Sequence, residues 1–174
     1  MDLIEQWRTV AEAFDLRYAA ITDEQWDDPT PCEEWDVRKV VDHVVTAQSR
    51  FGPLLGADIP EGAGWPEARD AMAAALADDS VLSRTVAVPG FGDLSGRQIL
   101  EICTYDLLIH TWDVSRAIGA DETLPPDAVA GCHAWLQGLP VEILRSSGRF
   151  ADPVDTDAQA DEQARMLAFA GRKP

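Results

Sequence analysis

The chain has 174 residues, of which 46% are hydrophobic and 26% charged, and this is the composition of an ordinary globular protein. Its length predicts a single domain, over residues 1–174, built around one hydrophobic core. The formal net charge of −17 repels phosphate backbones and anionic lipid surfaces, so we expect no nucleic-acid partner. No apolar run approaches the roughly 20 residues that span a bilayer, so we expect no membrane partner either.

The first residues and the cysteines indicate the compartment. The opening MDLIEQWRTV carries acidic residues and an amphipathic pattern, whereas a signal peptide would carry a basic region followed by an apolar one. We therefore expect a cytoplasmic protein. Cys32, Cys103 and Cys132 are odd in number and form no C-x-x-C pair, which argues against a disulfide framework and against a thiolate zinc site. We expect all three to be buried, unreactive thiols.

Helical periodicity of the apolar residues dominates the sequence and predicts an all-α protein. In chain order, the predicted helices cover about residues 3–22, 36–51, 66–78, 99–118, 126–145 and 158–170. The fifth continues to about residue 145, or it is bent or ends early at Pro140, because proline interrupts a helix. Four of these helices are expected to be the principal ones, with short extra helices around them.

Local signals mark where these helices begin and end. Asp36 stands at an N-cap position, and Ser95 with Gln98 fits a capping box ahead of the central helix. Gly119 and Gly171 stand where glycine commonly ends a helix.

Three segments between the helices read as non-helical. Residues 27–35 carry two prolines and predict a turn segment. Residues 52–65 are rich in glycine and proline and predict a long surface loop. The stretch from Arg84 to Val88 is β-prone, but we find no partner strand for it and expect an extended connection.

Polar residues in the central predicted helix are the first sign of a functional site. Asp106 and His110 lie one helical turn apart on an otherwise apolar stripe, and Asp113 follows on the same stripe. Burying a carboxylate and an imidazole costs free energy unless a hydrogen bond, an ion pair or a metal satisfies them. His43 flanks the valine face of the second helix and can point toward a neighbouring helix. Two imidazoles and a carboxylate from two helices would leave an open position, as in catalytic zinc sites.

Each of these residues also has a simpler interpretation. An Asp/His pair one turn apart is more often a hydrogen-bonded pair than a metal site, and His43 alone is more often a boundary histidine. Trp35 and Trp112 read more readily as core or lid packing than as a substrate platform. His133 lies outside any pattern, and we interpret it as structural or exposed.

Three stretches of the chain resemble the DinB-like and mycothiol-dependent maleylpyruvate isomerase-like superfamily. The first is TPCEEWDVR from Thr30, continuing to His43, and the second is DLLIHTWD from Asp106, followed by Ala-Ile-Gly at 117–119. The ending LAFAGR, at 167–172, looks like the closing segment of an actinobacterial branch. Together the stretches extend the resemblance over nearly the whole chain.

The resemblance implies a four-helix bundle that holds a divalent metal, zinc first and nickel second, with His43, Asp106 and His110. Isomerase relatives carry a glutamate and a histidine at the later pair, and many DinB-like relatives carry two histidines. Asp106 is therefore a departure, because aspartate is a competent ligand with a shorter reach.

The resemblance also implies a partner thiol of low molecular weight, such as mycothiol, and a small-molecule substrate. The metal would bind the thiol as a thiolate, which would attack an electrophilic molecule. The enzyme would then be an isomerase or an S-transferase, with Asp113 orienting a ligand or handling protons.

Two other functions stay open on the sequence. Water in place of the thiol would make a metal-dependent hydrolase. A non-catalytic bundle that binds a metal or a small ligand is the other, and the short side chain of Asp106 favours it mildly. A leftover apolar face would also allow a homodimer.

Overall fold

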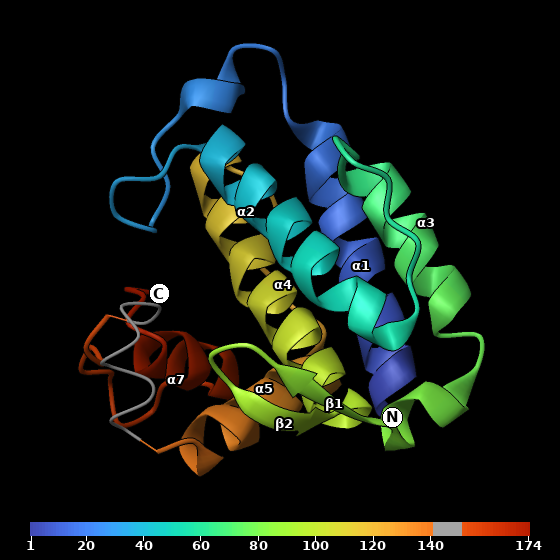
Figure 1. Ribbon diagram of the computed structural model, residues 1–174. Helices are drawn as coiled ribbons and strands as arrows, with labels where there is room; N and C mark the ends of the chain where they lie inside the picture. The colour runs from blue at the N-terminus through green and yellow to red at the C-terminus, as the bar shows by residue number, and fades with distance from the viewer. Residues whose placement is uncertain (141–150) are drawn as a thin grey trace.

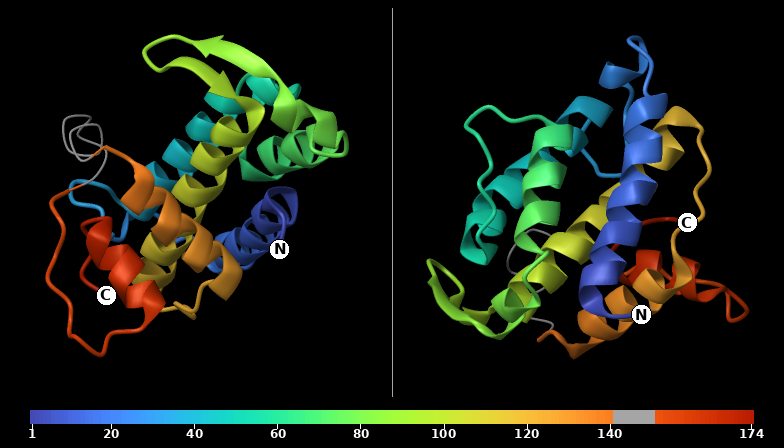
Figure 2. Two further views of the ribbon diagram at one scale, coloured as in Figure 1. Left: turned by 90° about the horizontal axis from the view of Figure 1, so that it is seen from below. Right: turned by 90° about the vertical axis from the view of Figure 1, so that its right-hand side faces the viewer.

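The computed structural model describes residues 1–140 and 151–174, which form six α-helices and one small β-hairpin (Figure 1). The expected all-α, DinB-like bundle with short extra helices is confirmed. The four helices of the bundle are α1 (Leu3–Ala20), α2 (Val37–Phe51), α3 (Trp65–Ala75) and α4 (Gly96–Ile118). The other two, α5 (Pro126–Gly138) and α7 (Glu162–Phe169), pack on each other beside one end of the bundle (Figures 1 and 2). No helix in the described ranges is both long and apolar enough to cross a membrane.

The longest helix, α4, is the centre of the fold because α1, α2 and α5 all pack against it. Its side chains are buried on nearly every side, as its almost continuous apolar sequence predicts. The largest fully buried side chains of the molecule come from several helices and meet around it; they include Trp7, Phe14, Ile99, Leu100, Leu107, Leu108, Trp112 and Leu136.

The helices begin where the sequence places their caps. The Asp36 carboxylate accepts a hydrogen bond from the Lys39 amide at 2.8 Å, which fixes the start of α2. Ser95 and Gln98 form the predicted reciprocal capping box at the start of α4. Gly119 ends that helix in the left-handed conformation, with φ of 68°.

One connection differs from its prediction. Residues Thr85–Val88 form strand β1, which pairs antiparallel with β2 (Gly92–Ser95), so the expectation of an extended connection without a partner strand is wrong. Only the second strand is hard to see in the sequence, because GDLS has no run of β-branched or aromatic residues. Gly90 in the turn and Gly92 at the start of β2 both have positive φ, and glycine tolerates that conformation.

Several helix bounds also differ from the predictions. The third and last helices are shorter than expected at one or both ends, and α5 ends before Pro140. The predicted extension of that helix over 141–145 lies outside the described residues. The predicted surface loop 52–65 begins with a 3-10 helix, η2 (Gly52–Leu55), and it buries Leu55 and Ala57 against the core. Two other 3-10 helices, η1 (Gln25–Asp27) and η3 (Asp79–Ser83), lie in connections.

The start of α4 is packed so closely against η3 that its first residue must be glycine. A Cβ atom built on Gly96 would lie 2.0 Å from the Val81 carbonyl oxygen and 3.1 Å from the Leu82 Cα. Both neighbours are backbone atoms, which cannot move aside as a flexible side chain can. The α4 helix can therefore keep its position only without a side chain here.

We predict that Gly96→Ala lowers the free energy of unfolding by about 1–3 kcal/mol, because overpacking displaces backbone. Gly138→Ala is the matched control, since a Cβ there meets nothing within 4 Å. Urea unfolding followed by circular dichroism measures both variants. Equal stability of the two would contradict the packing described for η3 and α4.

Candidate metal centre

Helices α2 and α4 bring together the three residues that the sequence marks as candidate ligands. His43, Asp106 and His110 each offer one donor atom, and these atoms all lie within 4.8 Å of one another. His43 comes from α2, and the other two lie one turn apart on the face of α4 that meets α2. The set is two imidazoles and a carboxylate, which matches a three-ligand zinc site with an open position.

The carboxylate lies between the two imidazoles. The Nε2 atom of His43 is 3.0 Å from Asp106 Oδ1, and the Nε2 atom of His110 is 3.7 Å from the same oxygen. The side chains of His43 and Asp106 are 35% and 26% exposed, whereas that of His110 is 8% exposed. One side of the centre is therefore open to small molecules and the other is closed by the protein.

The second carboxylate oxygen of Asp106 lacks a partner that a cation could supply. Asp106 Oδ2 is buried and has no hydrogen-bond partner. Burial raises the pKa of Asp106, but the charge of His110 and the hydrogen bond with His43 lower it, and the net pKa is below the usual value. A buried carboxylate oxygen that is ionised and unpartnered is costly, and a divalent cation would satisfy it. The residues present thus fit a metal.

Asp113 lies behind the centre and contacts His110 from the inside. Its Oδ2 atom is 2.9 Å from His110 Nδ1, and its side chain is completely buried. The ionised carboxylate can only accept, so Nδ1 is the donor to it, and a neutral ring in this tautomer would present its Nε2 lone pair to a cation. A carboxylate behind a ligating histidine is the usual arrangement around protein-bound metals.

Arg172, from the segment after α7, neutralises Asp113. Its Nη2 atom donates to Asp113 Oδ2 at 2.7 Å and its Nε atom to Oδ1 at 3.1 Å. Burial raises the pKa of Asp113, but the hydrogen bonds from His110 and Arg172 lower it further, so the pKa lies below its ordinary value. Gly171, at φ of 86°, turns the chain so that Arg172 enters the core. The sequence identifies Arg172 only as the last residue of the closing motif. Its role could have been anticipated because a buried Asp113 needs a cation as a partner.

The other buried polar residues of α4 are satisfied within the helix itself. The hydroxyl groups of Thr104, Thr111 and Ser115 each donate to the carbonyl oxygen four residues earlier, at 2.7–2.8 Å. Ser115 also accepts from the buried Arg17. Asp106 Oδ2 therefore stands out on this helix, because its buried polar neighbours have partners.

Two residues of the 27–35 segment also lie beside the centre. The indole of Trp35 contacts both imidazoles, with ring centroids 4.7 Å from His43 and 5.8 Å from His110. Cys32 is only partly buried, so the expectation of three buried thiols is wrong for this residue, although Cys103 and Cys132 are buried. Burial raises the pKa of Cys32 and the nearby charge of Arg172 lowers it, with a net increase. The segment folds back toward α2 through a bridge between Pro29 and Asp36.

The remaining candidates lie away from the centre. His133 is partly exposed on α5 and lies 3.7 Å from Glu162. Trp112 is buried in the core, with the Arg116 guanidinium over its ring.

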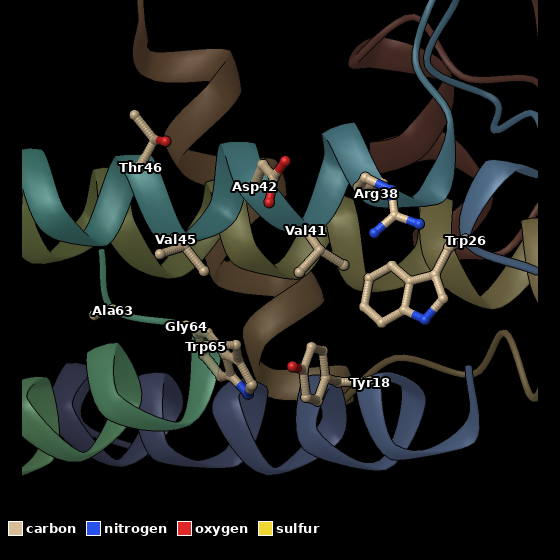
Figure 3. A pocket seen from close by; sticks show the side chains of 10 residues that line it. All are labelled: Tyr18, Trp26, Arg38, Val41, Asp42, Val45, Thr46, Ala63, Gly64 and Trp65. Carbon is tan, nitrogen blue, oxygen red and sulfur yellow. The ribbon is translucent and has the colours of Figure 1, made fainter. Parts of the chain in front are cut away.

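A hollow on the surface lies at a different place from the candidate metal centre. It measures about 500 Å³ and lies between α2 and the start of α3 (Figure 3). Figure 3 shows Val41 and Val45 along α2, with Trp65 and Tyr18 across the hollow from them and Trp26 at one end. None of the candidate ligands lines it, so we assign the site from its chemistry instead of its volume.

Comparison with known proteins shows similarity to one family model and to two mycobacterial proteins. Residues 7–80 match the model of the mycothiol maleylpyruvate isomerase N-terminal domain. Two uncharacterised proteins of Mycobacterium tuberculosis, MT0763 and Rv0738, come from different strains and are each 28% identical over 180 residues. The alignments cover 99% of this chain and 98% of each relative. No solved structure gives a significant match.

The bundle and its candidate metal centre are consistent with a helical domain of the DinB-like kind. More particularly, residues 7–80 are similar to the mycothiol maleylpyruvate isomerase N-terminal domain, and the whole chain is homologous to the two mycobacterial proteins. The matched region includes His43 and Trp35 but ends before Asp106, His110 and Asp113. The rest of the candidate site therefore lies outside the matched region.

We predict that Arg172→Met lowers the free energy of unfolding of the metal-free protein by about 3–5 kcal/mol near neutral pH, because Asp113 keeps a buried charge without its partner. The lowered pKa of Asp113 stabilises the wild type above the unfolded value of about 3.9, and this contribution is lost as the pH falls. The difference between variant and wild type should therefore shrink in acid. Urea unfolding from pH 7 to pH 3 measures it.

Arg8→Met is the control for this prediction, because Arg8 pairs with Glu5 on the surface. Its effect should stay below about 1 kcal/mol. A cost for Arg172→Met as small as the control's would contradict the role of the buried pair.

We also predict that Ellman's reagent modifies one of the three thiols of the native protein and all three after unfolding. The native reaction should accelerate as the pH rises, because the pKa of Cys32 is raised and the thiolate is the reactive form. Cys32→Ser should abolish it. Reaction of a second thiol in the native state would contradict the burial of Cys103 and Cys132.

Proposed function

We propose that this protein binds a divalent metal, zinc first and nickel second, with His43, Asp106 and His110. We propose further that it uses the metal to present a low-molecular-weight thiol, such as mycothiol, to a small electrophilic substrate. The observation that carries the proposal is the donor set itself, whose atoms lie within 4.8 Å of one another while Asp106 Oδ2 is buried without a partner. The family match supports the choice of thiol, because its description names mycothiol.

A bound divalent cation would lower the pKa of a thiol or a water at the open position, so that the ionised form is present near neutral pH. The chain's own residues have separate tasks around it. His110 would be held in one tautomer by Asp113, and Arg172 would keep that carboxylate ionised. Both oxygens of Asp113 are engaged, and the side chain has no exposed surface, which favours an orienting role over proton transfer.

The reaction class follows from a thiolate nucleophile. Its sulfur forms a bond to one carbon of an activated double bond, and the π electrons move to the electron-withdrawing group. If the same S–C bond breaks after rotation, the double bond re-forms and the product is an isomer. If a proton adds at the neighbouring carbon instead, the product is a thioether and the reaction is a transfer. Neither outcome needs an oxidant, so both suit the cytoplasm, where thiols stay reduced.

A non-catalytic metal- or ligand-binding bundle is the second candidate. It is favoured by the direct contact of His43 with Asp106 at 3.0 Å, because these two groups already satisfy each other in part. A metal-dependent hydrolase, with water at the open position, would use the same residues. Each of these functions allows a homodimer, and the experiments below separate the functions themselves.

We predict that protein purified without an affinity tag or a chelator holds close to one divalent metal ion per chain by elemental mass spectrometry. His43→Ala and His110→Ala should each lose it, because each removes one of three donors. His133→Ala is the matched control, since it alters the remaining histidine, outside the centre. A wild type that neither holds nor takes up zinc or nickel would contradict the proposal.

Calorimetry with mycothiol tests the second step. Binding should occur to the metal-loaded protein and not to the metal-free protein, and S-methyl mycothiol should bind far more weakly because it cannot form a thiolate. Equal binding to metal-free protein would remove the thiol from the proposal. Turnover of ester or amide substrates without added thiol would favour the hydrolase instead.

A further inference from the structure

Trp35 touches both histidines of the candidate centre. Its indole lies 4.7 Å from the His43 ring, with an angle of 48° between the planes, and 5.8 Å from the His110 ring at 25°. The two imidazoles are themselves 4.8 Å apart at 70°. The three rings thus form a closed cluster in which each contacts the other two.

An aromatic cluster of this kind limits how the imidazoles can turn. A histidine ring rotates easily about its last side-chain torsion, for which the preferred positions are broad. His110 is already held through Nδ1 by Asp113. His43 is 35% exposed, and the indole lies against its ring as well as against that of His110.

Hydrogen bonds hold the backbone on both sides of Trp35, and this fixes the point from which its side chain extends. The Trp35 carbonyl oxygen accepts from the Thr30 amide at 3.1 Å and lies 2.9 Å from the Thr30 hydroxyl. The Trp35 amide donates to the Cys32 carbonyl oxygen at 3.0 Å. Lys39, in the first turn of α2, donates from its Nζ atom to the Glu34 carbonyl oxygen at 3.2 Å.

The residue just before Trp35 is also strained. Glu34 has φ of 69°, the one positive value at a non-glycine residue among those the structure describes. A glutamate adopts this left-handed conformation only where the surrounding contacts impose it, and such residues gather at functional sites. Here the strained residue sets the direction in which the chain enters Trp35.

We propose that Trp35 is a positioning residue of the metal centre, which holds the imidazoles of His43 and His110 in the orientation that binds a cation. The inference rests on the proposed metal site and adds a residue to it. Removing the indole would remove the aromatic contact from both rings and leave their orientation to their polar partners. Loss of a group that orients metal ligands typically weakens metal binding by about 10–100-fold. Phenylalanine keeps an aromatic face and would restore part of the effect.

The test uses the full chain with Trp35→Leu, Trp35→Phe and Trp26→Leu. Trp26 is the matched control, because it is a partly exposed tryptophan that packs on Tyr18 and lines the hollow of Figure 3. Zinc affinity is measured by competition with a chromophoric chelator, and the visible spectrum of cobalt(II)-loaded protein reports the geometry at the metal. The melting temperature of the metal-free form records any purely structural effect.

We expect Trp35→Leu to weaken zinc binding by about 10–100-fold and to change the cobalt spectrum, with Trp35→Phe between it and the wild type. Trp26→Leu should match the wild type in zinc affinity and in the cobalt spectrum, even if it lowers the melting temperature of the metal-free protein as much as Trp35→Leu does. Unchanged affinity and spectrum in Trp35→Leu would overturn the positioning role while leaving the metal site standing. A wild type that binds neither zinc nor cobalt would overturn the proposed function itself.

Discussion

The buried charge of Asp113, on α4, is the constraint on which the rest of the site depends. A carboxylate without exposed surface requires a cation and hydrogen-bond donors, and the fold supplies both through Arg172 and His110. Arg172 can reach it only because α7 docks on α5 and Gly171 turns the chain inward. The position of the last residues of the chain is therefore tied to the orientation of a histidine in the middle of it.

The candidate centre draws its parts from both halves of the sequence. His43 and Trp35 belong to the region that matches the family model, whereas Asp106, His110, Asp113 and Arg172 lie beyond that region. The packing of α2 on α4 joins them. A shift of α2 relative to α4 would separate His43 from the pair on α4. The chemistry depends on the bundle as a whole.

Charge also distinguishes the two sides of the centre. The exposed edges of His43 and Asp106 face solvent around a protein of net charge −17, and such a field attracts divalent cations toward the open side. The inner side is closed by Asp113, Arg172 and the core of α4. A small molecule would therefore approach from the edge of α2, next to Trp35 and the partly buried Cys32.

The sequence by itself determined the features that depend on neighbours along the chain. Helical periodicity, the caps at Asp36 and Ser95, and the end of α4 at Gly119 are local, because they involve hydrogen bonds within one or two turns. The placement of Asp106 and His110 on one stripe follows from helix geometry alone. Only the tertiary structure decided that β1 has a partner strand and that His43 meets His110. The same holds for the ion pair of Arg172 with Asp113. It also holds for the packing of Trp35 on both imidazoles and for the partial exposure of Cys32. Those contacts join segments that are distant in sequence, and their formation depends on how whole helices pack, which no local pattern encodes.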